Sequence, residues 1–190
     1  ELGLFENPYA DEARVLEMFE TPQNRALARE IAQKSMVLLK NDGILPLKKT
    51  IRSLAVIGPN AAAGRNQLGD YSYAAMSYMM EYKQMENSCF INMDKEHFRK
   101  HDIKVANVLD GVNEAVSPDT QVLYAKGCET LEADTSAIQE AVAKANQADA
   151  VVMVIGDRSG LTPECTVGET RDSADLRLPG VQEQLFRAVK

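Results

Sequence analysis

Three short apolar runs constrain the fold of this chain more than any other feature. They occupy residues 53–58, 121–127 and 150–156, and each ends in a glycine. Short apolar runs rich in β-branched residues, closed by a turn residue, are typical of parallel strands buried on both faces. The runs therefore predict the strands of a parallel sheet.

Segments with helical periodicity lie before, between and after the predicted strands. The first runs from Arg25 to Leu39, with Thr21 as N-cap and Pro22 as the first helical residue, and it is expected to stop at 41–43. The others lie at 105–116, 135–147 and 180–190. Alternating strands and helices predict an α/β fold, a three-layer sandwich with a largely parallel sheet. Because the last helix would lead to a fourth strand, we expect the domain to be truncated at its C-terminus.

Composition narrows the classes of partner. Of the 190 residues, 45% are hydrophobic and 26% are charged, which is enough to form a core. Acidic residues outnumber basic ones by 28 to 21, a formal net charge of −7, so no nucleic-acid partner is expected. No run approaches the roughly 18–20 apolar residues that a membrane span needs, so no membrane partner is expected either.

The cysteines and histidines favour neither a disulfide framework nor a metal site. Cys89, Cys128 and Cys165 form no CxxC pair, and the only histidines, His97 and His101, are expected to be solvated. Free cysteines favour a reducing, cytoplasmic compartment. The chain begins without Met and without a signal-peptide pattern, so it is expected to be a fragment or a processed form, and its compartment stays unknown.

Residues 71–104 form an excursion rich in Met and Tyr without a clear period. One interpretation is a surface segment with a short helix packed by these side chains. The other is a loop that lines a binding cleft, since long loops in compact domains often carry function. The sequence leaves both open.

Ligands of open parallel sheets gather at the carboxyl ends of the strands. The loop at Gly58 suggests a nucleotide-binding turn, but it matches neither common phosphate-binding pattern. The loop at 156–179 holds many charges: Asp157, Arg158, Glu164, Glu169, Arg171, Asp172, Asp175 and Arg177. Spacing alone favours a solvated, salt-bridged loop over acid/base chemistry.

Four stretches together resemble the second domain of family 3 glycoside hydrolases, the β-glucosidase/β-xylosidase group. They are LGLFENPY at 2–9, AREIAQKSMVLLKNDGILPL at 28–47, LAVIGPNA at 54–61 and GETRDSADLRLPGVQ at 168–182, in the order of the family. The resemblance implies a retaining β-glycosidase that acts on β-linked glucosides or xylosides without a metal or organic cofactor.

The family also implies the organisation of the whole enzyme. A (β/α)8-type barrel carries the nucleophilic Asp, and a linker leads to the α/β sandwich that supplies the acid/base Glu. Residues 1–20 resemble the linker arm, and residues 21–190 resemble part of the sandwich. The implied partners are a β-linked oligosaccharide or glycoside and the barrel domain of the same protein.

The resemblance also assigns residues. Glu169 matches the general acid/base, and Asp172 matches the Asp that follows it in the family motif. Gly69 and Asp70, in the loop after the first strand, match positions that approach the sugar, so these two and Asp172 are expected to bind substrate. Glu164 is the rival acid, five residues before Glu169.

The competing hypothesis is a small-ligand- or nucleotide-binding α/β module without catalytic activity, motivated by the turn at Gly58.

Two expectations concern the isolated chain. If the family assignment is right, the 190-residue chain alone should be inactive, because it lacks the barrel's nucleophile. An open sheet edge at the end of the chain predicts a homo-oligomer or burial of that edge against a partner.

Overall fold

The computed structural model describes residues 3–9, 11–18, 20–81 and 105–190. The chain divides into two compact units, Glu1–Pro46 and Leu47–Lys190, which are considered separately. The linker arm expected at 1–20 and the single domain expected at 21–190 stay predictions. His97, His101 and Cys89, with most of the Met/Tyr-rich excursion, lie outside the described residues.

The first unit is helical. It contains a 3-10 turn η1 (Glu12–Arg14), a short helix α1 (Val15–Met18) and the longer helix α2 (Pro22–Ser35). The Asn24 amide donates to the Thr21 side-chain oxygen over 3.2 Å, which satisfies one of the amides that a helix start leaves unpaired. The predicted start of this helix is therefore confirmed.

The predicted end of α2 is wrong. The helix stops at Ser35, and Met36 is already extended, so residues 36–39 are not helical. The Ser35 hydroxyl donates to the Ala32 carbonyl over 2.9 Å, a local bond that competes with continued helix. Asn41, expected to belong to the helix stop, instead organises a separate turn: its side-chain oxygen accepts from the Gly43 and Leu45 amides.

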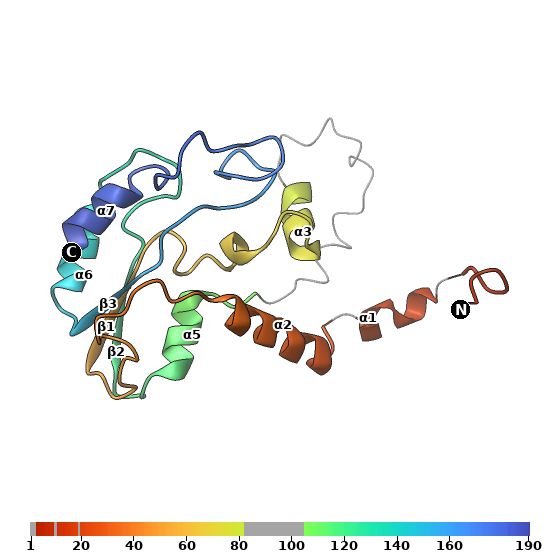
Figure 1. The fold of residues 1–190 in the computed structure, drawn as a ribbon, viewed down its shortest axis with the longest axis horizontal. Coiled ribbons are helices and arrows are strands. Elements are labelled where there is room, and N and C mark those ends of the chain that lie inside the picture. Colours follow the sequence, from red (N-terminus) through yellow and green to blue (C-terminus); the bar gives the residue numbers. More distant parts are fainter. Residues whose placement is uncertain (1–2, 10, 19, 82–104) are drawn as a thin grey trace. The chain divides into compact units, whose positions relative to one another are not determined.

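The second unit is built on a three-stranded parallel sheet in the order β2-β1-β3, as Figure 1 shows. The strands are β1 (Ser53–Ile57), β2 (Gln121–Ala125) and β3 (Ala150–Met153). Leu54 pairs with Val122 on one side and with Ala150 on the other. Central strand β1 is buried from Leu54 to Ile57, on both faces. The predicted strands and their parallel direction are confirmed, and the α/β fold with them.

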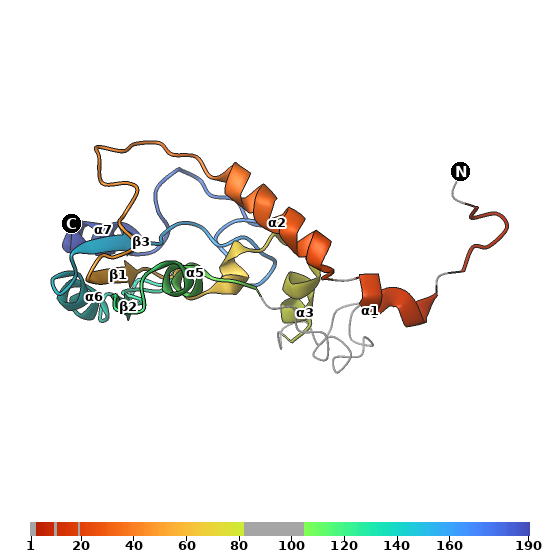
Figure 2. The same cartoon turned by 90° about the horizontal axis from the view of Figure 1, so that it is seen from below.

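The helices of the second unit follow the predicted pattern. They are η2 (Gly64–Gln67), α3 (Tyr73–Glu81), α5 (Val108–Ala115), α6 (Ile138–Ala145) and α7 (Gln182–Val189). The last three confirm the helices predicted at 105–116, 135–147 and 180–190, each somewhat shorter than its apolar pattern. Both Figure 1 and Figure 2 show α6 beside α7 next to the sheet. No helix in the described ranges is both long and apolar enough to cross a membrane.

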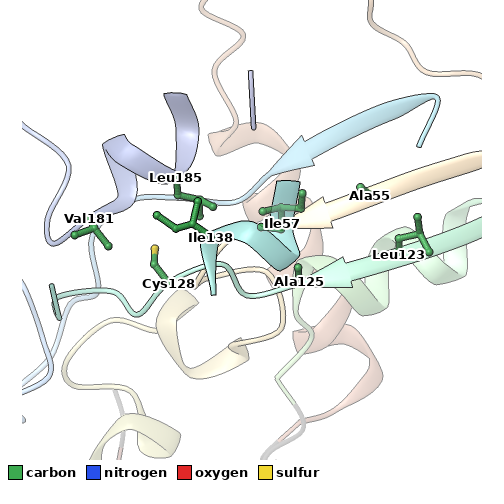
Figure 3. Packing of buried hydrophobic residues seen from close by; sticks show 9 residues of the cluster. Ala55, Ile57, Leu123, Ala125, Cys128, Ile138, Val181 and Leu185 are labelled. Carbon is green, nitrogen blue, oxygen red and sulfur yellow. The ribbon is translucent and has the colours of Figure 1, made fainter. Parts of the chain in front are cut away.

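The main core lies between the sheet and the pair α6–α7. Ile57 of β1, Ile138 of α6 and Leu185 of α7 meet there and are almost fully buried, as Figure 3 shows. Burying side chains of this size contributes about 1.5–3 kcal/mol each, which fixes both helices on this face.

Gln182 is the polar exception in this packing and is fully buried. Its side-chain oxygen accepts from the Gly156 amide over 2.8 Å, and its side-chain nitrogen donates to the Thr130 and Gly156 carbonyls over 2.9 and 3.0 Å. A buried amide is tolerated when its groups are paired in this way. Gln182 thus fixes the start of the loop after β3 to the start of α7.

Candidate active site

The loops that follow β1 and β3 meet at the carboxyl edge of the sheet. The Asn60 backbone amide donates to the Val154 carbonyl over 3.3 Å, and its side chain donates to the Gly156 carbonyl over 3.3 Å. Asn66 in turn donates to the Asn60 side-chain oxygen over 2.7 Å. Because β1 and β3 are adjacent and parallel, residues about 95 positions apart in the sequence are brought together here.

The loop after β3 folds back on itself to give two arms, residues 158–160 and residues 166–168. The Thr166 amide donates to the Arg158 carbonyl over 2.9 Å, and the Gly160 amide donates to the Val167 carbonyl over 3.1 Å. A side-chain bond adds to this pairing, since the Arg158 amide donates to the Thr166 hydroxyl over 2.9 Å. The two arms therefore form a small paired unit within the charged loop that spacing alone predicted to be solvated and salt-bridged.

Glu169 lies in a tight turn directly after the second arm. The Arg171 amide closes this turn by donating to the Gly168 carbonyl over 3.1 Å. Thr170 has a φ of 67°, a left-handed conformation in which a β-branched residue is a genuine outlier. The turn leaves Glu169 and Thr170 exposed. A carboxylate is thus presented to the outside on a short, hydrogen-bonded turn.

Asp70 connects the loop after β1 to both arms. One oxygen of its carboxylate accepts from the Ser159 hydroxyl over 2.5 Å, and the other accepts from the Glu169 backbone amide over 3.3 Å. Asp70 itself is partly buried. Of the residues predicted to form the site, Asp70 and Glu169 are therefore brought into contact, through the backbone of Glu169.

Two arginines contact one tyrosine beside the arms. The guanidinium carbons of Arg65 and Arg158 lie 5.7 and 5.5 Å from the centre of the Tyr78 ring, which is within the range of cation–π attraction. Arg65 also donates to the Ser159 carbonyl over 3.4 Å. Sequence reasoning missed Arg65, Tyr78 and Ser159, because these contacts join three segments that no local motif connects.

Glu164, the rival acid, sits between the arms and is turned inward. Burial alone would raise the pKa of its carboxyl. Hydrogen bonds from Thr162 and from its own backbone amide, with the charges of Arg158 and Arg171, outweigh burial and lower this pKa below its ordinary value. One carboxylate oxygen of Glu164 is fully buried and has no hydrogen-bond partner within the described residues. Glu164 is thus partly buried, and its neighbours favour the ionised form of its carboxyl.

Neither Asp172 nor Gly69 takes part in the hydrogen bonds that join Asp70 to Ser159 and to Glu169. Asp172 lines a pocket of about 700 Å³ formed mainly by residues 172–180 and the start of α7. Gly69, Asp70, Glu164 and Glu169 do not line this pocket. Two of its arginines are paired within the pocket: Arg177 with Asp175, and Arg187 with Glu183. Thr166 of the second arm lines the pocket, but Glu169 does not.

The first amides of the turn at Gly58 are hydrogen-bonded within the protein. The Gly58 amide donates to the Ala125 carbonyl over 3.1 Å, and the Asn60 amide donates to the Val154 carbonyl. The Ala61 amide donates to the Gly58 carbonyl over 3.2 Å, and Pro59 has no amide hydrogen. Phosphate loops work through amides that point at the ligand. This turn uses its amides to connect strands and loops.

Comparison with known proteins identifies the family. A sequence profile described as "Glycosyl hydrolase family 3 C-terminal domain" matches residues 36–190. The chain belongs to glycosyl hydrolase family 3. The predicted resemblance is confirmed, and the matched residues include the whole of the second unit together with the end of the first.

Relatives within family 3 include enzymes with two kinds of name. A "Beta-xylosidase" of Formosa agariphila is 35% identical over 192 residues, which cover 99% of this chain and 23% of that protein. A "Periplasmic beta-glucosidase" of Salmonella typhimurium is 29% identical over 216 residues, covering 100% of this chain and 24% of that protein. The chain thus spans about a quarter of the length of these relatives.

A solved structure supports the fold. The structure of a β-glucosidase involved in saponin metabolism from intestinal bacteria superposes with a TM-score of 0.74 at 28% identity. The match covers 99% of this chain and 25% of that one. The family 3 chain therefore has the α/β architecture of a glycosidase domain.

Proposed function

We propose that the protein to which this family 3 chain belongs is a retaining β-glycosidase that cleaves terminal β-linked glucosides or xylosides. In this proposal Glu169 is the general acid/base. The names of the relatives, "Beta-xylosidase" and "Periplasmic beta-glucosidase", support the substrate class. Gly69 and Asp172 remain proposed substrate-binding positions, and the resemblance predicts the same role for Asp70.

The observation that carries the proposal is the turn at Glu169. The carboxylate is exposed, and the next residue, Thr170, has a φ of 67°. Strained backbone of this kind costs about 1–3 kcal/mol and persists where the surroundings hold it, commonly at functional sites. The two paired arms, together with the bond from the Glu169 amide to Asp70, are the surroundings that hold it here.

The same geometry argues against Glu164. A general acid must be protonated at the working pH and must reach the departing oxygen. The pKa of Glu164 is lowered, and one of its oxygens is enclosed within the loop. Glu164 is better explained as a structural counter-charge for Arg158 and Arg171.

The proposed chemistry needs a second carboxyl. Retaining glycosidases place a nucleophile about 5–5.5 Å from the acid/base, and the nucleophile forms a covalent glycosyl-enzyme intermediate. In this proposal the nucleophile comes from a barrel domain of the same protein. Glu169 then donates a proton to the leaving oxygen and later removes one from the attacking water.

The alternative of a nucleotide-binding module has little support, since the turn at Gly58 uses its amides internally. A binding titration separates the two functions. ATP, ADP and NAD should give no saturable heat with the protein in calorimetry. Saturable binding of any of them at micromolar concentration would favour the module.

The catalytic role is tested in the full-length protein with Glu169→Gln and the matched variant Glu164→Gln. Both are assayed on aryl β-glucosides and β-xylosides with good and poor leaving groups. Loss of the acid should lower the glycosylation rate on poor leaving groups by about 10²–10⁴-fold, because these need protonation. Activated dinitrophenyl glycosides should retain most of that rate, since their leaving groups depart as anions.

Glu164→Gln should lower the rate by a similar factor on every substrate, if it lowers it at all. If Glu164→Gln shows the dependence on leaving group and Glu169→Gln does not, the assignment of the acid is overturned. If neither variant shows this dependence and the parent protein cleaves no β-glycoside, the proposed function itself is wrong.

A further inference from the structure

Asp70 makes two hydrogen bonds that a residue serving only the substrate would not need. Its carboxylate accepts from the Ser159 hydroxyl on the first arm and from the Glu169 amide just beyond the second arm. These partners are 89 and 99 positions away in the sequence. One side chain from the loop after β1 therefore holds both arms of the loop after β3.

The packing around Gly168 brings this carboxylate unusually close to the backbone. A Cβ at Gly168 would lie 2.7 Å from one Asp70 oxygen and 2.7 Å from the Gly160 carbonyl oxygen. No real side chain fits such a space without movement of its neighbours. The Asp70 carboxylate thus lies directly against the residue that precedes Glu169.

Arg65 supports the same arrangement from five residues earlier. It donates to the Ser159 carbonyl, while Asp70 accepts from the Ser159 hydroxyl. Arg65 also contacts Tyr78 of α3, and Arg158 of the first arm contacts the same ring. These contacts fix the first arm to η2 and α3. Asp70 then connects the first arm to the backbone of Glu169.

We propose that Asp70 is a positioning residue for Glu169: its carboxylate sets the backbone of the acid/base by joining it to Ser159. The inference rests on the proposed function, since it gives Glu169 a reacting role. A carboxylate that accepts from a backbone amide forms a charge-assisted bond, which is stronger than a neutral one. Displacement of a catalytic group by about 1 Å costs up to about 10²-fold in rate.

This role differs measurably from direct binding of the sugar, the role that the resemblance gives to Asp70. Loss of a sugar contact weakens binding of every substrate with the same glycone, whatever its leaving group. Loss of the positioning bond impairs protonation, so only substrates that need protonation suffer. The dependence on leaving group therefore separates the two roles.

The test uses Asp70→Asn in the full-length protein, with Ser159→Ala as a second variant and Asp119→Asn as control. Asp119 is exposed in the turn before β2, at the opposite end of the sheet. We expect Asp70→Asn to lower kcat on an alkyl or phenyl β-glycoside by about 10–100-fold. On the dinitrophenyl glycoside its glycosylation rate, measured before steady state, should fall by less than about 3-fold. Ser159→Ala should show the same pattern more weakly, and Asp119→Asn should match the parent.

A double variant shows whether the effect passes through Glu169. In a Glu169→Gln background, Asp70→Asn should change the rate on the poor substrate by less than about 2-fold, because the group it positions no longer donates a proton. Full additivity of the two substitutions would overturn the inference. Uniform loss on all substrates in both Asp70→Asn and Ser159→Ala would also overturn it. If Glu169→Gln alone shows no dependence on leaving group, the proposed acid/base role of Glu169 is wrong. This result differs from the two results that would contradict the positioning role of Asp70.

Discussion

At the scale of single residues, Gly168 combines a backbone conformation and a set of neighbours that exclude a side chain. Its φ is 130°, a region that L residues rarely adopt. The Asp70 carboxylate and the Gly160 backbone leave no space for a Cβ. The sequence offers a signal for this, a glycine directly before the proposed acid, but the identity of the group that needs the space appears only in the structure.

Replacement of Gly168 by Ala should therefore destabilise the protein. We expect the free energy of unfolding to fall by about 2–4 kcal/mol. About 1–3 kcal/mol of this comes from the strained backbone of Ala at this φ, and the rest comes from displacement of Asp70. Thermal and urea unfolding followed by circular dichroism measure it. Gly111→Ala is the control, since Gly111 lies in helix α5 with nothing within 4 Å of an added Cβ. That change should be neutral or stabilising by up to about 1 kcal/mol. Equal effects of the two substitutions would contradict this account of Gly168.

The contact between Asp70 and Glu169 shows what a motif leaves open about the side chains that it contains. Both residues were predicted from family motifs, and the structure brings them together across 99 positions. The predicted role of Asp70 was binding of sugar, whereas in the structure its carboxylate accepts hydrogen bonds from the Ser159 hydroxyl and the Glu169 amide. A motif records which residue stands at a position, but the direction of a side chain depends on segments distant in the sequence.

At the scale of elements, the amino ends of β1 and β3 are joined by a surface ion pair. Asp149, just before β3, accepts from the Arg52 guanidinium over 3.0 Å and from the Ser53 amide over 3.2 Å. The hydrogen bond from Arg52 is the main cause that holds the pKa of Asp149 below its ordinary value, and the charge of Arg52 and the bonds with Ser53 add to it. The ionised carboxylate thus favours the paired arrangement of the strands.

The sign of the resulting pH dependence follows from this lowered pKa. The stabilisation is fully present above the unfolded pKa, about 3.9, and is lost as the pH falls through the lower folded pKa. Asp149→Asn should lower Tm modestly at pH 7, and its difference from the parent should shrink below about pH 4. Calorimetric melts between pH 7 and pH 2.5 measure it, with Asp119→Asn as control. A difference that stays constant or grows in acid would show that the ionised carboxylate does not stabilise the strands.

The elements themselves were largely predictable from local pattern. The three strands follow from continuous apolar runs, because a central parallel strand must be apolar on both faces, as β1 is. The end of α2 was not predictable in this way. The apolar period continues through Leu39, but the chain turns extended at Met36 after the Ser35 hydroxyl bonds to the Ala32 carbonyl. The apolar period of a segment thus does not fix where its helix ends.

At the scale of the whole molecule, the chain spans about a quarter of its relatives, while the proposed chemistry needs two carboxyls. We therefore expect the purified 190-residue chain to show no turnover of 4-nitrophenyl β-glucoside or β-xyloside above background. Mixing it with a separately produced barrel domain should restore activity if the two parts associate. Turnover by the chain alone, unaffected by Glu169→Ala, would mean that the reacting groups lie elsewhere.

The central claim is that Glu169 is the acid/base of a retaining glycosidase, and chemical rescue of Glu169→Ala in the full-length protein tests it most directly. The variant should form the glycosyl-enzyme from a dinitrophenyl β-glycoside and then stall, because no base activates the water. Added azide should restore turnover, since it attacks without a base, and the product should be the β-glycosyl azide by nuclear magnetic resonance. Glu164→Ala should show no rescue. An α-glycosyl azide would contradict the retaining mechanism, and rescue of Glu164→Ala in place of Glu169→Ala would contradict the assignment of the acid.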